Sequence, residues 1–194
     1  MASIFSLSAS PSTDIWKKPP STNVFKAPSR PHSSGPVSTF ASAAITFTTT
    51  YTHQYDQAGM LLTITNPADP AAPRKWIKTG IEYYNGIPRL SVVCCDSWAD
   101  WSVAQVTSGA DEIIAGTKSV TINVVREDDE HGSSWWVYHV DGDKKTPLRE
   151  ICWVLGDNGG EGLDVEVSAL VARPGKVATD ELEANFSDFD VEWK

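Results

Sequence analysis

The sequence predicts an all-β fold, either a two-sheet sandwich or a jelly roll. Three observations lead to this prediction. Apolar and polar residues alternate in strand-like runs from about residue 40 onward, turn-forming residues separate most of these runs, and no segment of twelve residues carries the apolar stripe of a helix. A chain of 194 residues suits one such domain with a single core.

The clearest element is a hairpin between residues 76 and 95. One face of its first strand carries aromatic and charged side chains, namely Trp76, Lys78, Glu82 and Tyr84. The opposite face carries the apolar Ile77 and Ile81. Asn85-Gly86 supplies the two positive-φ residues of a tight turn. The apolar return run Leu90–Cys95 suits a strand that a second sheet buries.

Further strands follow from the same alternation, and turn residues separate most of them. They are expected at Ala44–Thr52, Gly59–Thr65, Val120–Glu127, Ser134–Val140, Arg149–Leu155 and Leu163–Ala172. A single helical turn is expected at Asp111–Ala115. Residues 1–40 are rich in Ser, Pro and Thr, so we expect them to lack regular structure and to wrap the domain of residues 41–194 in extended form, pinned by Trp16 and Phe25.

Composition narrows the classes of partner and compartment. A formal charge of -9 argues against nucleic acid and anionic membrane as partners, because phosphate contacts need clustered Lys and Arg. No run has transmembrane length, and the N-terminus lacks the basic flank and apolar core of a signal peptide. Cys94 and Cys95 are successive strand residues that point to opposite faces, which indicates buried thiols and a cytoplasmic protein. Edge strands permit a homodimer without requiring one.

Motifs for metals, cofactors and nucleophiles are not found in the sequence. The four histidines have no ligand spacing, and neither a CxxC motif nor a phosphate-binding glycine loop nor a nucleophile elbow occurs. We therefore expect no metal and no cofactor. The acidic run 127–130 could be imagined as a calcium loop, but a solvated turn is the stronger interpretation. Asp164 and Glu166 share a strand face and could form a glycosidase pair, although a plain polar face explains them more simply.

Eight tryptophans suggest a concave pocket with an aromatic lining. Any single tryptophan is more often core packing than ligand contact. The candidate substrate-binding residues are Gln57, Trp76, Tyr84, Trp98, Trp136, Arg149 and Trp153, and the candidate catalytic residues are Glu82, Lys78 and Tyr138. Inside such a face, Lys78 or Arg149 would have to pair with Glu82, because a buried charge is costly when it is unpaired. Ligand recognition and a purely structural salt bridge both explain such a pair.

Several motifs in order carry a resemblance to a known family. They are Tyr55-Asp56-Gln57-Ala58-Gly59, WIKTGIEYYNG, Leu90-Ser91-Val92-Val93, Asp100-Trp101-Ser102, WWVYHVDG, LREICWVLG, VEVSALVARPG and FSDFDVEW. The chain resembles, from about Trp16 to Trp193, the fungal "regulation of enolase" family of concanavalin A-like jelly rolls. It is also similar to small jelly-roll proteins of fungal secondary metabolism that assist hetero-Diels–Alder couplings of tropolone-derived quinone methides to terpenes. The resemblance implies a concanavalin A-like sandwich, a fold that is shared by lectins, glycosidases and non-catalytic modules.

Two functions can use the expected pocket. The first is a cofactor-independent pericyclase, a hetero-Diels–Alderase in which orientation of an aromatic or terpenoid substrate supplies most of the catalysis and one acid–base residue assists. The alternative is a non-catalytic protein of the enolase-regulator type that binds a carbohydrate or metabolite. An enclosed, tryptophan-lined cavity with few polar groups favours the pericyclase, whereas an open groove rich in donors and acceptors favours a sugar.

Overall fold

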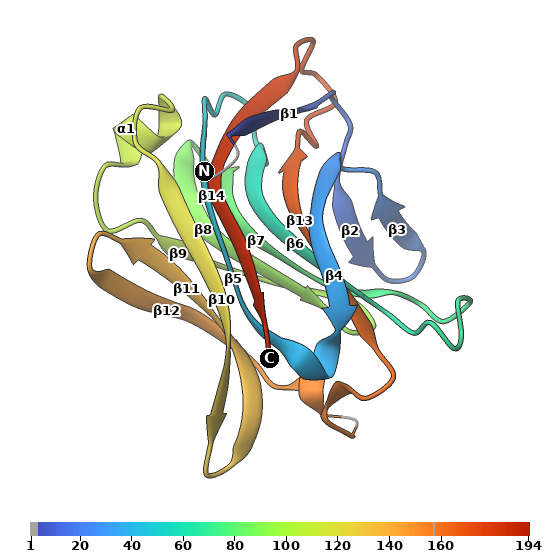
Figure 1. Ribbon diagram of the computed structural model, residues 1–194. Coiled ribbons are helices and arrows are strands. Elements are labelled where there is room, and N and C mark those ends of the chain that lie inside the picture. The colour runs from blue at the N-terminus through green and yellow to red at the C-terminus, as the bar shows by residue number, and fades with distance from the viewer. Residues whose placement is uncertain (1–3, 157) are drawn as a thin grey trace.

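Two antiparallel sheets of six strands each pack against one another in the computed structural model, which describes residues 4–156 and 158–194 (Figure 1). Sheet I has the order β1 (Phe5–Ala9), β14 (Leu182–Trp193), β5 (Phe40–Thr49), β10 (Val120–Asp129), β11 (Gly132–Asp141) and β12 (Lys144–Ile151). Sheet II has the order β4 (Ser29–Pro36), β13 (Asp164–Ala172), β6 (Gln57–Thr65), β7 (Lys75–Tyr84), β8 (Ile87–Cys95) and β9 (Ala99–Gln105). This arrangement confirms the predicted all-β jelly-roll sandwich.

Within residues 4–156 and 158–194, helical structure is confined to short connections. They are α1 (Ala110–Ile114), which matches the expected single turn, and the 3-10 turns η1 (Val37–Thr39), η2 (Trp153–Leu155) and η3 (Asn158–Gly160). None of the described helices is long and apolar enough to cross a membrane.

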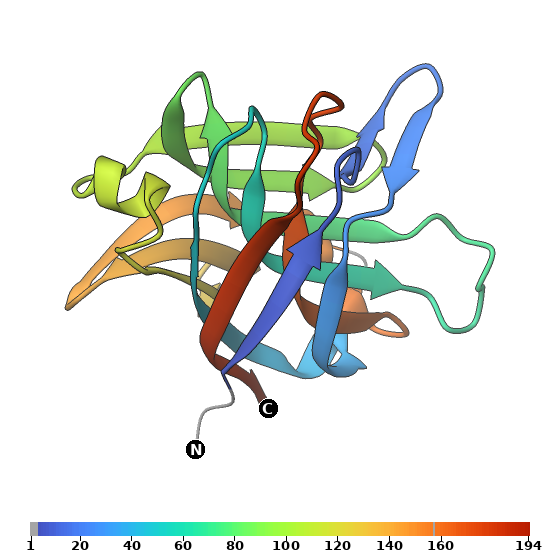
Figure 2. The same cartoon turned by 90° about the horizontal axis from the view of Figure 1, so that it is seen from above.

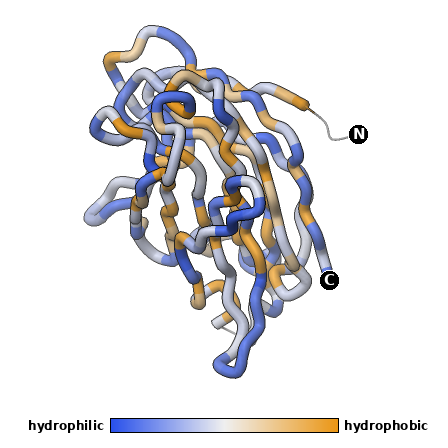
Figure 3. The backbone as a smooth tube through the Cα atoms, turned by 90° about the vertical axis from the view of Figure 1, so that its left-hand side faces the viewer, coloured by the Kyte–Doolittle hydropathy of each residue, from blue (hydrophilic) through white to orange (hydrophobic). Residues whose placement is uncertain are grey.

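The inner faces of the two sheets form the main core. Alternation places Ile77 and Ile81 of β7 opposite Ile122 and Val124 of β10, and all four are buried. The fully buried Trp135 of β11 packs against Phe40. Figure 3 shows apolar stretches along the strands, whereas the β10–β11 tip, which is the lowest loop in this view, is hydrophilic.

A second, smaller core lies on the outer face of sheet II. There the hairpin of β2 (Ile15–Lys18) and β3 (Thr22–Phe25) stands on the side of sheet II away from sheet I (Figure 2). Ile15 packs with Trp76, Cys95 and other buried residues of sheet II to form what we call the hairpin cluster. Strands β6 to β8 are therefore buried on both faces, which explains why Leu90–Cys95 is almost wholly apolar.

The structure corrects two expectations about regular elements. Residues 1–40 do form strands, since β1 and β4 are edge strands of the two sheets and β2 and β3 form the hairpin. The prolines of β4 are tolerated because an edge strand leaves one row of its backbone groups unpaired. The strand expected at Arg149–Leu155 ends at Ile151, and η2 follows it.

The hairpin turn and the cysteines were predicted correctly. Asn85 and Gly86 have φ values of 53° and 76°, as a turn with two positive φ angles requires. All three cysteines are free. Cys94 is buried in the main core and Cys95 in the hairpin cluster, so the two neighbours do face opposite sides of β8.

Candidate functional site

A cleft of about 400 Å³ lies on the outer face of sheet II, beside the β2–β3 hairpin. This volume falls within the usual range for small-molecule sites, about 300–1,000 Å³. The floor comes from the sheet and consists of Gln57, Lys78, Glu82 and Val93. Strand pairing sets their positions, because Gln57 lies directly opposite Glu82, and Lys78 directly opposite Val93.

The roof comes from the N-terminal segment. Asp14, Trp16 and Lys18 have one parity and line the cleft, while Ile15 has the other parity and anchors the hairpin in its cluster. Sequence reasoning missed this role for Asp14 and Lys18. Trp16 was expected only to pin an extended segment, and its position two residues from each charged neighbour was the available signal.

Lys78 joins the roof to the floor. Its side chain is only 7% exposed, and Nζ donates to Asp14 Oδ1 at 3.2 Å and to the carbonyl oxygen of Ile15 at 2.9 Å. The expected Lys78–Glu82 salt bridge is therefore replaced by a Lys78–Asp14 pair. The reason is that the hairpin brings Asp14 over β7, although 64 residues separate it from Lys78 in sequence.

Glu82 is a buried carboxyl on the same face. Its carboxylate accepts a hydrogen bond from Ser91 Oγ at 2.8 Å, and Ser91 Oγ accepts one from Trp101 Nε1 at 3.1 Å. Burial raises the pKa of Glu82 above its ordinary value of 4.5, while the charge of Lys78 and the hydrogen bond from Ser91 oppose the shift. A carboxyl with a raised pKa that borders a cleft is a candidate proton donor and acceptor.

Aromatic side chains also line the cleft. Tyr55 and Trp101 line it directly, with ring centroids 6.4 Å apart, and Pro174 lines it as well. Tyr84 packs edge-on against Trp101 at 5.1 Å. Tyr84 thus supports the Trp101 ring without lining the cleft itself.

Two predicted tryptophans lie near the cleft but outside it. Trp76 shares the outer face of β7 with Lys78 and Glu82, but the hairpin cluster buries it to 3% exposure. Trp98 is 44% exposed, and Lys17 Nζ lies 5.2 Å from its ring centroid in a separate shallow groove.

Other predicted residues lie on elements that do not line the cleft. Trp136 and Tyr138 stack at 6.0 Å on β11 of sheet I, and the Tyr138 hydroxyl donates to Glu127 at 2.6 Å. Burial, followed by Glu127, raises the pKa of Tyr138 to about 12, which makes it a poor acid at neutral pH. Arg149 of β12 donates to the carbonyl oxygen of Asp100 at 3.1 Å, so the expected Arg149–Glu82 pair is not formed.

Trp153 lies in η2, where it packs against the main core, and Lys75 Nζ is 5.6 Å from its ring centroid. The structure therefore brings together Gln57, Lys78 and Glu82 in one cleft, with Tyr84 behind it, and places the remaining predicted residues elsewhere.

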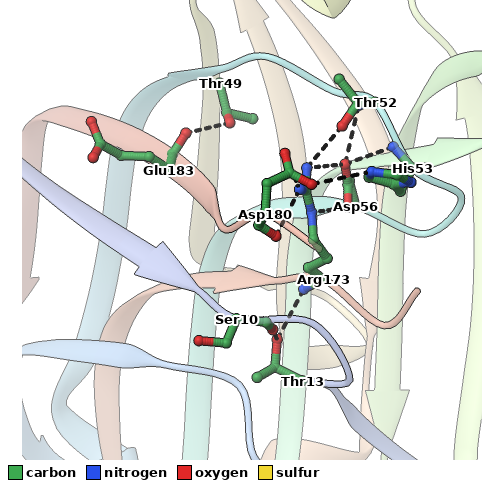
Figure 4. Close-up of polar contacts among 9 residues, drawn as sticks. All are labelled: Ser10, Thr13, Thr49, Thr52, His53, Asp56, Arg173, Asp180 and Glu183. Atoms are coloured by element: carbon green, nitrogen blue, oxygen red, sulfur yellow. Dashed lines mark hydrogen bonds and ion pairs between the residues drawn. The ribbon is translucent and has the colours of Figure 1, made fainter. Parts of the chain in front are cut away.

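A polar cluster around Arg173, which sequence reasoning missed, links three segments that border the cleft (Figure 4). The guanidinium of Arg173, at the end of β13, bonds to the carboxylate of Asp56 and to Asp180. The backbone N–H of Arg173 donates to Thr13 Oγ1 at 3.0 Å. Each of three cleft-lining residues, Asp14, Tyr55 and Pro174, directly adjoins a member of this cluster in sequence.

The described residues contain no group of three or more His, Cys, Asp or Glu side chains that could hold a metal ion. Asp164 and Glu166 lie on the outer side of β13, with Val165 and Val167 fully buried between the sheets. This placement agrees with the simpler interpretation of the pair as a polar strand face.

The fold and the cleft define a jelly-roll β-sandwich protein with a ligand-sized site under an N-terminal hairpin. The chain belongs to the family described as "Protein of unknown function (DUF1349)", whose model matches residues 2–193. An uncharacterised protein of Emericella nidulans is 40% identical over 189 residues, which cover 97% of this chain and 86% of that protein.

Two solved structures show the same fold at low sequence identity. A functionally unknown protein from Saccharomyces cerevisiae is 19% identical with a TM-score of 0.66, covering 99% of this chain and 92% of that one. The alginate lyase from Klebsiella pneumoniae is 11% identical with a TM-score of 0.50, covering 80% of this chain and 60% of that one. Both likenesses concern the fold alone.

Proposed function

We propose that the protein binds a small, ring-bearing polar molecule, such as a carbohydrate or a phenolic metabolite, in the cleft under the hairpin. The observation that carries this proposal is the set of three polar side chains on the floor. Gln57, Lys78 and Glu82 are each at most 6% exposed, yet all three border the cleft. Lys78 and Glu82 have partners within the protein, whereas the Gln57 amide makes no side-chain hydrogen bond in the described part of the chain, and a ligand in the cleft supplies one.

The mixture of side chains favours the binding of a polar, ring-bearing molecule over the enclosure of a hydrocarbon. Five charged or amide side chains border the cleft, namely Asp14, Lys18, Gln57, Lys78 and Glu82, together with the aromatic rings of Trp16, Tyr55 and Trp101. Rings stack on the flat faces of a ligand, while donors and acceptors fix its hydroxyl groups. The charge of Lys78 is balanced by Asp14, which suits a neutral ligand.

The second candidate is the cofactor-independent hetero-Diels–Alderase, and the raised pKa of Glu82 is the observation that favours it. Protonated Glu82 donates a proton to the hydroxyl of an ortho-hydroxybenzyl alcohol, the C–O bond breaks, and water leaves. The phenolic proton then passes to the carboxylate of Glu82 and regenerates the acid. The resulting quinone methide adds to an alkene by forming one C–C and one C–O bond, and orientation in the cleft supplies the rate enhancement.

The resemblance to the enolase-regulator family supports a non-catalytic form of this proposal. A regulatory role of the enolase-regulator type would use the same cleft to sense a metabolite without chemistry. A cytoplasmic location fits the three free cysteines, because thiols persist in reducing compartments.

One titration tests the proposal. Tryptophan fluorescence of the native protein is followed against panels of neutral sugars and phenols, and the hits are repeated on Glu82→Gln and Glu150→Gln. The control is matched, because each glutamate accepts a hydrogen bond of 2.8 Å from a buried strand serine, but Glu150 lies on sheet I. We expect the Glu82 variant alone to lose affinity. Equal affinities in both variants would contradict ligand binding next to Glu82 in this cleft.

The catalytic candidate has its own measurement. An ortho-hydroxybenzyl alcohol is incubated with an alkene, and the rate and enantiomer ratio of the adduct are compared with and without protein. A racemic product formed at the uncatalysed rate excludes this candidate for that substrate class, and it leaves the binding proposal to the titration.

A further inference from the structure

A pair of glycines leaves a gap in the floor of the cleft. Gly59 of β6 lies directly opposite Gly80 of β7, and the same row across sheet II continues to Leu170 on one side and Ser91 on the other. A Cβ atom at Gly59 would overlap the carbonyl oxygen of Thr79, and one at Gly80 would overlap that of Ala58. Only glycine fits at these two positions, so no side chain fills this part of the floor.

A small hollow of about 10 Å³ lies at Gly80 and shares Gln57, Lys78 and Glu82 with the main cleft. This is the lower limit of the space that holds one water molecule, roughly 10–15 Å³. Four polar side chains border the hollow, those of Gln57, Lys78, Glu82 and Ser91, and its remaining lining comes from Ala58, Thr79, Gly80, Ile81 and Leu170. Because it holds at most one small group and four polar side chains face it, a single oxygen atom suits it better than a methyl group.

The polar side chains around the hollow have unused hydrogen-bonding capacity. Lys78 Nζ carries three donors, and two of them are used by Asp14 and Ile15. The carboxylate of Glu82 accepts from Ser91 Oγ through Oε2, and a carboxylate offers about four acceptor positions in all. The amide of Gln57 makes no side-chain hydrogen bond within residues 4–156 and 158–194, although Gln57 is only 5% exposed. An oxygen that accepts from Lys78 and donates to Glu82 or Gln57 would satisfy these groups.

We propose that the hollow at the Gly59–Gly80 pair is a subsite for one oxygen atom, occupied by a water in the free protein and by a ligand hydroxyl in the complex. The ligand part of this statement rests on the proposed binding function. It adds that the ligand inserts a hydroxyl group into the floor, while its ring lies between Trp16 and Trp101. The subsite therefore selects hydroxylated rings over hydrocarbons of the same size.

The water part is tested first, by a crystal structure of the free protein at a resolution that shows ordered solvent. We expect one water within hydrogen-bonding distance of Lys78 Nζ and of the Glu82 carboxylate. The variant Ser91→Val adds methyl groups at the end of the hollow and should expel this water. Ser134→Val is the matched control, since Ser134 is also a buried strand serine bonded to a glutamate, but in sheet I. A dry hollow in the native protein, or a water that persists in Ser91→Val, overturns the proposal.

The hydroxyl part is tested with phenol and toluene, two ring probes of similar size. Backbone amide signals of Gly59 and Gly80 and indole signals of Trp16 and Trp101 are followed by NMR. We expect phenol to bind about threefold to tenfold more tightly than toluene, as one hydrogen-bonded hydroxyl allows, and to shift the glycine signals. Ser91→Val should abolish the glycine shifts, and Ser134→Val should retain them.

The outcomes separate the two proposals. Equal binding of both probes, with no shift at the glycines, overturns the subsite while it supports a ring-binding cleft. If neither these probes nor the sugars bind, the proposed function fails, and the crystallographic water then decides on the oxygen site by itself.

Discussion

Arg173 and Asp56 form a bidentate ion pair that is buried in the protein. Arg173 Nε lies 3.0 Å from Asp56 Oδ1, Nη2 lies 2.9 Å from Oδ2, and the exposed fractions of the two side chains are 1% and 0%. Asp56 also accepts the backbone N–H groups of Thr52 and His53 at 3.1 and 2.9 Å. Each charge is therefore stabilised in the interior by the other, and Asp180 and Thr52 Oγ1 add further acceptors for Arg173.

Removal of either partner should destabilise the protein strongly. We expect Arg173→Met and Asp56→Asn each to lower the free energy of unfolding by about 3–5 kcal/mol, because each leaves buried polar groups without partners. The double variant should lose clearly less than the sum of the two single losses. Urea denaturation curves of all four proteins measure this coupling, and strictly additive losses would contradict the described pairing.

Glu82→Gln should increase stability at neutral pH while it weakens ligand binding. The folded-state pKa of Glu82 is raised, so the unfolded chain ionises first, near the ordinary value of 4.5. The favourable contribution of Glu82 is therefore fully present below that value and is lost as pH rises through the raised pKa. Unfolding measured from acidic to neutral pH should show this decline in the native protein and a flatter profile in the variant. A variant that is less stable at every pH would contradict the sign of the shift.

Lys78→Met should loosen the hairpin over the cleft. The substitution removes the bonds from Nζ to Asp14 and to the carbonyl oxygen of Ile15, and we expect a loss of roughly 1–3 kcal/mol. Hydrogen exchange of the β2 and β3 amides should accelerate. Lys75→Met is the control on the same strand, because its pair with Asp96 is partly exposed and contributes only about 0–1 kcal/mol. Equal exchange rates in both variants would show that Lys78 does not hold the hairpin.

The three thiols should differ in reactivity. Cys152 is exposed, whereas Cys94 and Cys95 are buried, and burial raises the pKa of both. A colorimetric thiol reagent should therefore label one cysteine of the native protein and three after denaturation. Partial desolvation, followed by the charge of Glu150, also raises the pKa of the exposed Cys152, so its labelling should be slower than that of a free cysteine. Rapid labelling of more than one thiol in the native state would refute the described packing.

The alternation of apolar and polar residues within strands predicted the sandwich, and for β7 it predicted which side chains share a face. It placed Lys78 and Glu82 together with Trp76 on one side of β7, where the structure has them. Alternation could not predict to which of the two sheets a strand belongs, and therefore on which outer face of the sandwich its polar side chains lie. Trp136 and Tyr138 have the composition of a binding site, yet they belong to sheet I, because strand order is set by pairings distant in sequence.

The roof of the cleft could not be predicted from the sequence for a similar reason. Prolines in residues 1–40 argued against strands, but edge positions and a short hairpin accept them. The partner of Lys78 comes from that segment, so the pairing of charges could not be read from β7 alone. Strand β14 was not predicted, because irregular pairing between Ser187 and Asp190 interrupts it, and Asp188 has a positive φ of 47°.

The hairpin over the cleft is an excursion between two strands that are each fixed at a sheet edge, β1 and β4. None of the pairings within the two large sheets passes through it in the described chain. Changes in the turn between β2 and β3 therefore leave the strand register of the sandwich intact. Asp14 and Ile15 at its base have to stay, because they hold the buried charge of Lys78 and fill the hairpin cluster, so variation is confined to the tip between β2 and β3.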